Sequence, residues 1–312
     1  MTASSIPGLE NTDLNRTPVQ RKPRYRVKNL LLAAVLVVPN LALLLVFTYR
    51  PLIDNIRLSF YNWNIASTRP ATFVGLGNYV EWASKPESWQ IVGQTLVFTF
   101  CAVFGSMVLG LGLALLLDKP LRGRNAVRSL IFAPYVISGA AIGVAFQFVF
   151  DPGYGLIQDL LGKLGMSSPD FYTSPFWAMV MITSTYIWKN LGYTFVIYLA
   201  ALQGLRKDLD EAAEIDRTPP ARKFWRVTLP QLRPTTFFLS ITVLLNSLQV
   251  FDIINVMTGG GPLEISTTTL VYQVYQETFV NSRAGYGAAV ATIMFLAVLV
   301  ITVVQVRWQE KK

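Results

Sequence analysis

Six apolar stretches, each long enough to cross a lipid bilayer, constrain this chain more than any other feature. About 20 apolar residues form a transmembrane helix, and a helix satisfies its own backbone hydrogen bonds where no water is present. The 312 residues are 52% hydrophobic and 14% charged, unlike those of a soluble domain. We predict an all-α polytopic membrane protein with six transmembrane helices, at residues 30–49, 90–117, 129–150, 176–203, 235–257 and 284–306.

The distribution of lysine and arginine predicts how the chain crosses the membrane. Twenty of these residues fall in the N-terminal tail, in segments 118–128 and 204–234, and at the C-terminus, whereas six fall in the loops between. Because positive residues are enriched in cytoplasmic loops, both termini and segment 204–234 are expected in the cytoplasm. Residues 1–28 form a basic tail that is expected to be disordered, followed by the transmembrane domain 29–312. In the first outer loop, Trp63, Trp82 and Trp89 are expected at the membrane interface.

Composition excludes several functional classes. The net charge of +9 does not indicate a nucleic-acid-binding surface, because the basic residues are spread over short loops beside apolar stretches. The chain has no histidine and one cysteine, Cys101, so we expect no internal disulfide, zinc site or thiol catalysis. It also lacks the G-x-x-x-x-G-K-[ST] sequence that binds nucleotide phosphates. We expect neither an enzyme nor a bound cofactor in this chain.

Segment 204–234 is too charged to cross the membrane and lies between two apolar stretches. Residues 211–216 favour a helix, whereas Pro219 and Pro220 permit at most a new helix start. The part that follows mixes Phe224 and Trp225 with basic residues, as expected for a short helix on a partly apolar partner surface. We predict two short helices joined by a bend and exposed on the cytoplasmic side.

The same segment carries a resemblance to a known family. Glu211-Ala212-Ala213, Asp216, Thr228-Leu229-Pro230 and Pro234 resemble, at this spacing, the cytoplasmic EAA loop of ABC-importer permeases. The resemblance implies the type I (MetI-like) permease fold and a pair of coupling helices that dock on an ATPase subunit. The residues expected to make this contact are Glu211, Ala212, Ala213, Asp216, Arg217, Phe224, Trp225, Arg226, Leu229 and Pro230. Arg217 and Thr218 stand where the family usually has glycine and alanine, so the two prolines are expected to shape the bend.

Two predicted outer loops extend the resemblance. Segments 150–157 and 257–262 are similar to those of carbohydrate-importer permeases. The resemblance implies a bacterial inner membrane location and a translocation pathway shared with a second homologous permease subunit. It also implies two ABC ATPase subunits, which would bind ATP and Mg²⁺, and a periplasmic or lipid-anchored substrate-binding protein. Membrane lipid is a further expected partner.

Polar residues within two of the predicted helices are candidates for the translocation pathway, because such residues are costly in lipid. In 176–203, positions i, i+3, i+4 and i+7 share one helix face and hold Tyr186, Lys189, Asn190 and Tyr193. In 235–257, a second stripe contains Asn246, Gln249 and Asp252, with Asn255 further round the helix. Alternatively, these side chains hydrogen bond to one another or to the helices of a partner.

Three shorter sequences, 188–193, 267–272 and 303–305, resemble the first permease of sn-glycerol-3-phosphate and glycerophosphodiester importers. A phosphate cargo needs a cationic partner once it has lost its water, which agrees with Lys189 in the pathway. The expected cargo is therefore a glycerophosphodiester or sn-glycerol-3-phosphate. A disaccharide such as trehalose or maltose is the alternative, because Trp188, Tyr186 and Asn190 suit a sugar. An ion-coupled secondary transporter or a membrane scaffold would leave the EAA-like loop unexplained.

Overall fold

The computed structural model describes residues 27–118, 123–206, 208–209, 215–261 and 265–310, and most of them are helical. The chain divides into two compact units, Met1–Ile53 and Asp54–Lys312. The first unit contains helix α1 (Val27–Leu44), a π-helical turn η1 (Leu45–Tyr49) and the start of α2 (Arg50–Leu58). Pro39 lies inside α1. Residues 1–26 of the predicted disordered tail lie outside the described residues.

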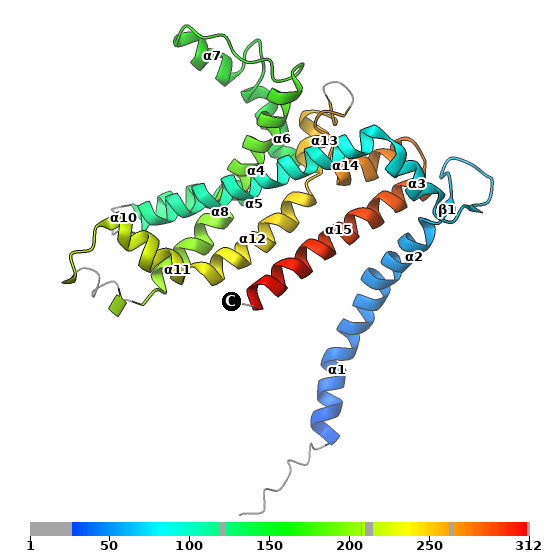
Figure 1. The fold of residues 1–312 in the computed structure, drawn as a ribbon, viewed down its shortest axis with the longest axis horizontal. Helices are drawn as coiled ribbons and strands as arrows, with labels where there is room; N and C mark the ends of the chain where they lie inside the picture. Colours follow the sequence, from blue (N-terminus) through cyan, green and yellow to red (C-terminus); the bar gives the residue numbers. More distant parts are fainter. Residues whose placement is uncertain (1–26, 119–122, 207, 210–214, 262–264, 311–312) are drawn as a thin grey trace, which may run out of the picture. The chain divides into compact units, whose positions relative to one another are not determined.

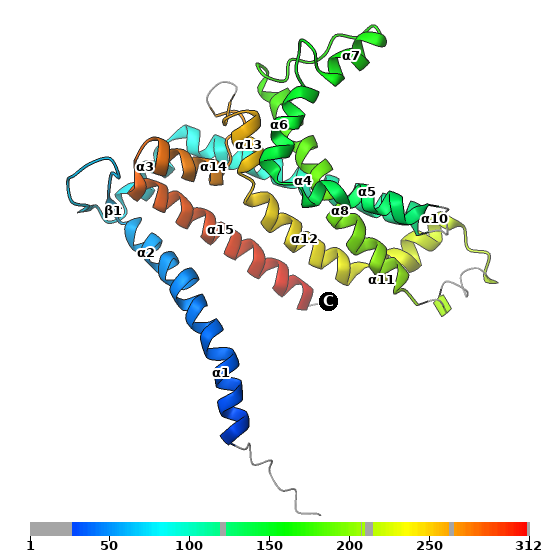
Figure 2. The same ribbon diagram turned by 180° about the vertical axis from the view of Figure 1, so that it is seen from behind.

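The second unit contains a two-stranded antiparallel hairpin and the remaining helices (Figures 1 and 2). Strands β1 (Tyr61–Asn62) and β2 (Thr72–Phe73) precede α3 (Gly77–Ser84). The longer helices that follow are α4 (Pro86–Leu117), α5 (Arg124–Val136), α6 (Gly139–Val149), α7 (Leu156–Lys163), α8 (Pro175–Gln203), α12 (Arg233–Leu248) and α15 (Ala284–Glu310). The shorter elements are α10 (Pro220–Lys223), η2 (Phe224–Thr228), α11 (Leu229–Gln231), α13 (Asp252–Met257), α14 (Leu270–Tyr275) and η3 (Gln276–Val280).

Helices α4, α8 and α12 run side by side in the second unit (Figure 1). Their facing side chains form a buried apolar core of Ala114, Leu117, Phe195, Tyr198, Leu199, Leu202, Leu232, Leu239 and Val243. Van der Waals packing of this kind holds helices together where the surrounding solvent is itself apolar. The core therefore fixes how α8 and α12 present their polar residues.

Four helical stretches are long and apolar enough to cross a membrane: Ala34–Leu58, Pro86–Leu117, Arg233–Met257 and Ala284–Trp308. A fifth span is obtained if α5 and α6 count as one bent span. Helix α8 begins one residue before the predicted fourth span, and its 29 residues correspond to about 44 Å. Its polar residues, Lys189 and Asn190 among them, lower its hydropathy. The described residues therefore show four or five apolar spans, and the prediction of six is confirmed only in part.

The third predicted span, 129–150, is wrong as a single straight helix. Helices α5 and α6 meet at an angle of 104°. Pro134 lies inside α5, and Ile137 ends that helix with an extended backbone (φ −74°, ψ 143°). Ser138 then caps α6, because its hydroxyl oxygen accepts a hydrogen bond from the Ala141 N–H at 3.2 Å. The span was predicted from the length of its apolar stretch, and that length does not reveal a helix break at a proline followed by a capping serine.

The fifth predicted span also contains a break. Helix α12 ends at Leu248, and α13 begins at Asp252. The prediction that Asn246, Gln249 and Asp252 share one face of a continuous helix is therefore wrong in its geometry. The break allows Asp252 to occupy the first turn of α13, where a negative charge is favourable. A turn follows this span, in which Gly259 and Gly260 have φ values of +57° and +84° that favour glycine.

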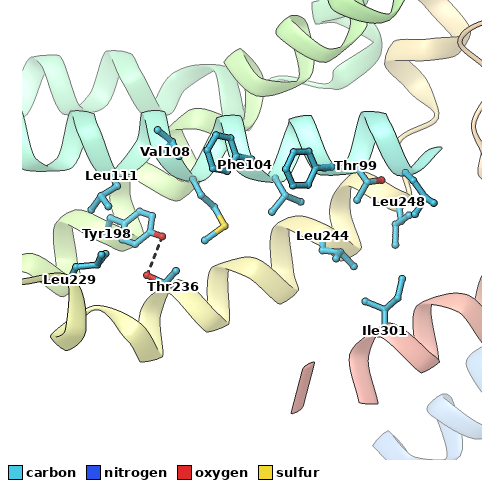
Figure 3. A pocket seen from close by; sticks show the side chains of 14 residues that line it. Thr99, Phe104, Val108, Leu111, Tyr198, Leu229, Thr236, Leu244, Leu248 and Ile301 are labelled. Carbon is cyan, nitrogen blue, oxygen red and sulfur yellow. Dashed lines mark hydrogen bonds between the residues drawn. The ribbon is translucent and has the colours of Figure 1, made fainter. Parts of the chain in front are cut away.

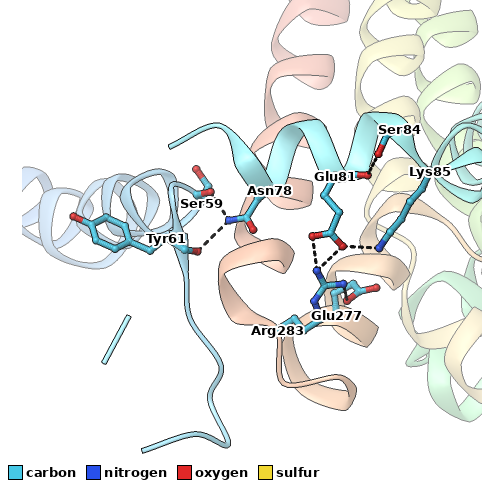
Figure 4. A network of polar contacts seen from close by, with 8 residues as sticks. All are labelled: Ser59, Tyr61, Asn78, Glu81, Ser84, Lys85, Glu277 and Arg283. Carbon is cyan, nitrogen blue, oxygen red and sulfur yellow. Dashed lines mark hydrogen bonds and ion pairs between the residues drawn. The ribbon is translucent and has the colours of Figure 1, made fainter. Parts of the chain in front are cut away.

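A network of charged side chains joins α3 to the segment between η3 and α15 (Figure 4). The Arg283 Nη2 contacts both carboxylate oxygens of Glu81, at 2.6 and 2.7 Å. The Lys85 Nζ contacts Glu81 Oε1 at 2.7 Å. Both cations also lie over the ring of Tyr286, 4.8 Å (Lys85) and 4.2 Å (Arg283) from its centre. These contacts connect elements about 200 residues apart in the sequence.

Trp82 lies on the same helix, α3, but points into the protein. It is 5% exposed, and its Nε1 donates a hydrogen bond to Gln273 Oε1 at 3.2 Å. Trp63 and Trp89 are exposed, as an interfacial position requires. The predicted interfacial position is therefore wrong for Trp82, because a partner distant in the sequence satisfies its indole N–H inside the core.

Acid is expected to weaken the contact between Glu81 and Arg283. Burial alone would raise the pKa of Glu81, but hydrogen bonds from Lys85 and Arg283 outweigh burial and hold the pKa below its ordinary value of 4.5. The ionised carboxylate therefore contributes stability above that value, and the contribution is lost as the pH falls below it. Both side chains are more than a third exposed, so solvent screening limits the contribution to about 1 kcal/mol.

Thermal unfolding of the wild type and of Arg283→Gln, each at about pH 7 and about pH 3.5, measures this contribution. The variant is expected to melt at a lower temperature near pH 7, and the difference is expected to shrink at the acidic pH. A difference that is equal at both pH values would contradict the assigned role of the Glu81 carboxylate.

Candidate functional site

A polar cavity of about 370 Å³ lies between α5, α8 and the break that separates α12 from α13. It is lined by Tyr135, Tyr186, Lys189, Asn190, Asn246, Gln249, Val250, Asp252 and Ile253. The structure thus brings together six of the eight residues predicted for the pathway. Tyr193 lies beside the cavity, its ring stacked on that of Tyr135 with centres 5.2 Å apart, whereas Asn255 is exposed and does not line it. Tyr135 was not among the predicted residues, although Pro134 beside it signals a bend.

Lys189 brings a positive charge to this cavity. Its Nζ donates a hydrogen bond to the Tyr135 carbonyl oxygen at 3.3 Å and lies 5.4 Å from the centre of the Tyr135 ring. Within the part of the chain that the structure describes, Lys189 forms no ion pair with a carboxylate. A half-buried ammonium without a counter-ion is electrostatically costly, and an anionic ligand would relieve that cost.

Asp252, the acidic residue of the cavity, is engaged by the neighbouring backbone. Its Oδ1 accepts a hydrogen bond from the Ile253 N–H at 3.0 Å. Its Oδ2 lies against Gly139, the first residue of α6, where an added Cβ would stand 1.9 Å from that oxygen. The partial positive charge at the N-terminus of α6 stabilises the carboxylate there. Asp252 therefore helps to hold α6 beside α13 and leaves the charge of Lys189 without a counter-ion.

The other polar residues predicted on α8 differ in whether they have hydrogen-bond partners. Asn190 is buried and donates through Nδ2 to the Tyr186 carbonyl oxygen at 2.9 Å. The Tyr193 hydroxyl donates to Thr242 Oγ1 at 3.3 Å. The Tyr186 ring packs edge-on against Phe98 at 5.3 Å, and its hydroxyl has no hydrogen-bond partner among the described residues. Asn190 and Tyr193 therefore form hydrogen bonds within the chain, as the alternative interpretation expects. The Tyr186 hydroxyl forms none among the described residues.

A second cavity, of about 500 Å³, is almost entirely apolar (Figure 3). Side chains from α4, α8, α12 and α15 line it, among them Phe104, Leu244 and Ile301. At one end the Tyr198 hydroxyl donates a hydrogen bond to Thr236 Oγ1 at 3.3 Å. This surface suits acyl chains or an apolar helix and offers little to a phosphate or a sugar. The polar cavity at Lys189 is therefore the better candidate for cargo binding.

The second half of the predicted coupling segment is described by the structure. Elements α10, η2 and α11 form a helical stretch over residues 220–231, which begins directly after Pro219. The wider turn η2 precedes Pro230, whose ring does not fit a regular α-helical turn. Trp225 is 65% exposed and stacks edge-on against Phe224, with ring centres 5.3 Å apart. Of the remaining predicted residues, Asp216, Arg217 and Arg226 are exposed, and Leu229 and Pro230 are half-buried.

Residues 207 and 210–214, among them Glu211, Ala212 and Ala213, lie outside the described residues, so the helix expected over 211–216 stays a prediction. Leu232 follows the second half and is fully buried in the core of α4, α8 and α12. The buried Leu232 side chain therefore connects the coupling segment to α8 and α12, the helices whose residues line the polar cavity. A large apolar side chain such as Trp225 that remains in solvent is typical of a contact surface.

Arg217 has a left-handed backbone conformation, with φ of +49°. Such a conformation costs a residue other than glycine roughly 1–2 kcal/mol, and glycine usually occupies this position in the family that the segment resembles. The bend therefore depends on Arg217 as well as on the prolines. We expect Arg217→Gly to keep the bend and Arg217→Val to strain it, so the glycine variant should have the higher melting temperature. A higher melting temperature for the valine variant would contradict the left-handed conformation.

Comparison with known proteins agrees with this architecture. Residues 106–312 match the family described as "Binding-protein-dependent transport system inner membrane component". The sulfoquinovosyl glycerol transport system permease protein SmoG of Agrobacterium fabrum is 35% identical over 277 residues, which cover 89% of this chain and 90% of SmoG. The sn-glycerol-3-phosphate transport system permease protein UgpA of Pectobacterium atrosepticum is 34% identical over 279 residues, which cover 89% of this chain and 94% of UgpA.

Solved structures share the fold. A chain of a bacterial ABC transporter involved in the import of the acidic polysaccharide alginate superposes with a TM-score of 0.80 at 22% identity, over 91% of this chain and 97% of that chain. The same kind of transporter in complex with an alginate pentasaccharide-bound periplasmic protein gives a TM-score of 0.77 at 22% identity, over 89% and 94% of the two chains. The resemblance inferred from the EAA-like loop is thereby confirmed. This multi-pass membrane protein belongs to the binding-protein-dependent transport system inner membrane components, the permease subunits of ABC importers.

Proposed function

We propose that this chain forms half of a translocation pathway for a glycerophosphodiester or sn-glycerol-3-phosphate, and that a homologous permease subunit forms the other half. The observation that carries the proposal is the Lys189 ammonium, which faces a polar cavity and forms no ion pair with a described carboxylate. A phosphate that has lost its water would accept charge-assisted hydrogen bonds from Nζ. The names of the two relatives support an anionic glyceryl cargo, since sn-glycerol-3-phosphate carries a phosphate and sulfoquinovosyl glycerol a sulfonate.

The proposed topology has six spans, in which the bent α5–α6 pair forms one and α8 forms another. The uneven distribution of lysine and arginine supports cytoplasmic termini and a cytoplasmic segment 204–234. Two ABC ATPase subunits, which bind ATP and Mg²⁺, would then dock on this segment around Trp225. Their closure would rock the spans between inward-open and outward-open arrangements, while a substrate-binding protein delivers cargo to the outer loops.

A disaccharide is the second candidate cargo, because the stacked rings of Tyr135 and Tyr193 beside the cavity suit the apolar face of a sugar. Uptake competition with the intact importer in proteoliposomes separates the two. Unlabelled sn-glycerol-3-phosphate is expected to compete with labelled glycerophosphocholine, and maltose and trehalose are not. Competition by the disaccharides alone would overturn the phosphate assignment. Uptake that follows a proton or sodium gradient without ATP would overturn the importer mechanism.

A further inference from the structure

A third cavity, of about 540 Å³, lies where α4 and α8 end and α5 begins. Its lining consists of Leu115, Asp118, Arg124, Arg128, Leu202, Gln203, Leu205, Arg206 and Thr228. Three arginines and one aspartate give this lining a net positive charge. None of these residues belongs to the polar cavity at Lys189 or to the residues assigned to ATPase contact.

The Arg128 guanidinium group has only part of its hydrogen-bonding capacity satisfied within the described chain. Its Nη2 donates a hydrogen bond to the Leu117 carbonyl oxygen, at the end of α4, at 3.0 Å. Its Nε is buried and has no hydrogen-bond partner among the described residues. A buried charged donor without an acceptor is costly, and such groups are rare in folded proteins. Because Arg128 also lines the cavity, an anion there would compensate the positive charge of its guanidinium group.

Arg124 occupies an electrostatically unfavourable position for the chain alone. It is the first residue of α5, where the helix dipole is positive, and the first turn of this 13-residue helix contains no acidic residue. Within the described part of the chain, the Arg124 side chain makes no hydrogen bond or ion pair. The third arginine, Arg206, is already paired with Asp208 at 2.5 Å. Arg124, Arg128 and the N-terminus of α5 thus converge on one cavity and all favour an anion.

We infer that this cavity binds the phosphate group of an anionic phospholipid such as phosphatidylglycerol. Leu115, Leu202 and Leu205 provide an apolar wall beside the arginines, which suits the junction between a headgroup and its acyl chains and not a free anion. The cavity lies at the ends of α4 and α8, where lipid headgroups are expected once these two helices cross the bilayer. The topology proposed above places it in the cytoplasmic leaflet, next to Thr228 of the coupling segment, so the bound lipid supports that segment.

Lipid retention by the purified importer complex, measured by native mass spectrometry during titration with phosphatidylglycerol, tests the inference. Arg124→Gln removes one cation and no contact within the described chain, so the complex should bind the lipid about fivefold more weakly. Asp118→Asn removes the opposing charge and should tighten binding. The matched control is Arg307→Gln, which removes an exposed arginine from the last turn of α15 and should change nothing.

Lipid binding by Arg124→Gln that equals that of Arg307→Gln would overturn the inference. Displacement of the lipid by millimolar inorganic phosphate would assign the cavity to a free anion instead. Loss of ATPase subunits from Arg124→Gln with full lipid retention would assign it to an acidic side chain of the partner. Retained lipid together with absent phosphodiester uptake would overturn the proposed cargo and leave the lipid site standing, because the two measurements are independent.

Discussion

Lys189→Ala is expected to lower ATP-driven uptake of a glycerophosphodiester about 10- to 100-fold, because a hydrogen bond to a charged group contributes roughly 1.5–3 kcal/mol. The Lys189 ammonium donates a 3.3 Å hydrogen bond to the Tyr135 carbonyl oxygen and lies over the Tyr135 ring, and it forms no ion pair with a described carboxylate. Its removal should therefore leave folding and assembly intact. Initial uptake rates in proteoliposomes, normalised to the amount of complex that co-purifies, measure the effect.

Lys163→Ala is the matched control, since Lys163 is exposed on α7 and pairs with Asp159 at 2.7 Å. Its uptake should equal that of the wild type. Lys189→Arg keeps the positive charge and should retain more uptake than the alanine variant. Wild-type uptake by Lys189→Ala would remove Lys189 from the pathway, and the argument for a phosphate cargo would fail with it.

Trp225→Ala is expected to lower substrate-stimulated ATP hydrolysis by the assembled importer about 30-fold, the effect of losing a central aromatic contact at an interface. Trp225 is 65% exposed in this chain, so its truncation removes little intramolecular packing. The loss should therefore appear in coupling and in co-purification of the ATPase subunits, and not in the melting temperature of the permease.

Trp89→Ala provides the comparison, because Trp89 is exposed to a similar extent, 59%, and lies at the start of α4 on the proposed outer side. That variant should hydrolyse ATP at the wild-type rate. Equal stimulation in Trp225→Ala and wild type would mean that the ATPase docks elsewhere.

Features that depend on local sequence were predicted well. Helix α8 begins within one residue of its predicted start, because apolar length and a proline at the helix start are readable in the sequence. The helical stretch 220–231 begins after Pro219 for the same reason. The spacing of Tyr186, Lys189 and Asn190 placed them on one face, and all three line the polar cavity.

Features that depend on tertiary contacts were not predicted. The 104° bend between α5 and α6 places Tyr135 at the polar cavity. The length of the apolar stretch predicts neither the bend nor the position of Tyr135. The contact between Asp252 and Gly139 requires α6 and α13 to meet, which no periodicity within one helix reveals. Tryptophan is typical of membrane interfaces, so the sequence favoured that position for Trp82. Its hydrogen-bond partner, Gln273, is 191 residues away in the sequence.

The proposed coupling requires segment 204–234 to be cytoplasmic, and cysteine labelling measures on which side of the membrane it lies. The native Cys101 is exposed and is first replaced by alanine. Ile215→Cys, at a position 83% exposed, and Tyr154→Cys, at one 73% exposed in a proposed outer loop, are then treated with a membrane-impermeant maleimide. We expect the cysteine at position 215 to be labelled in urea-washed inside-out vesicles and not in intact cells, and the cysteine at position 154 to be labelled in intact cells and not in the vesicles. Labelling of position 215 from outside intact cells would contradict the cytoplasmic location.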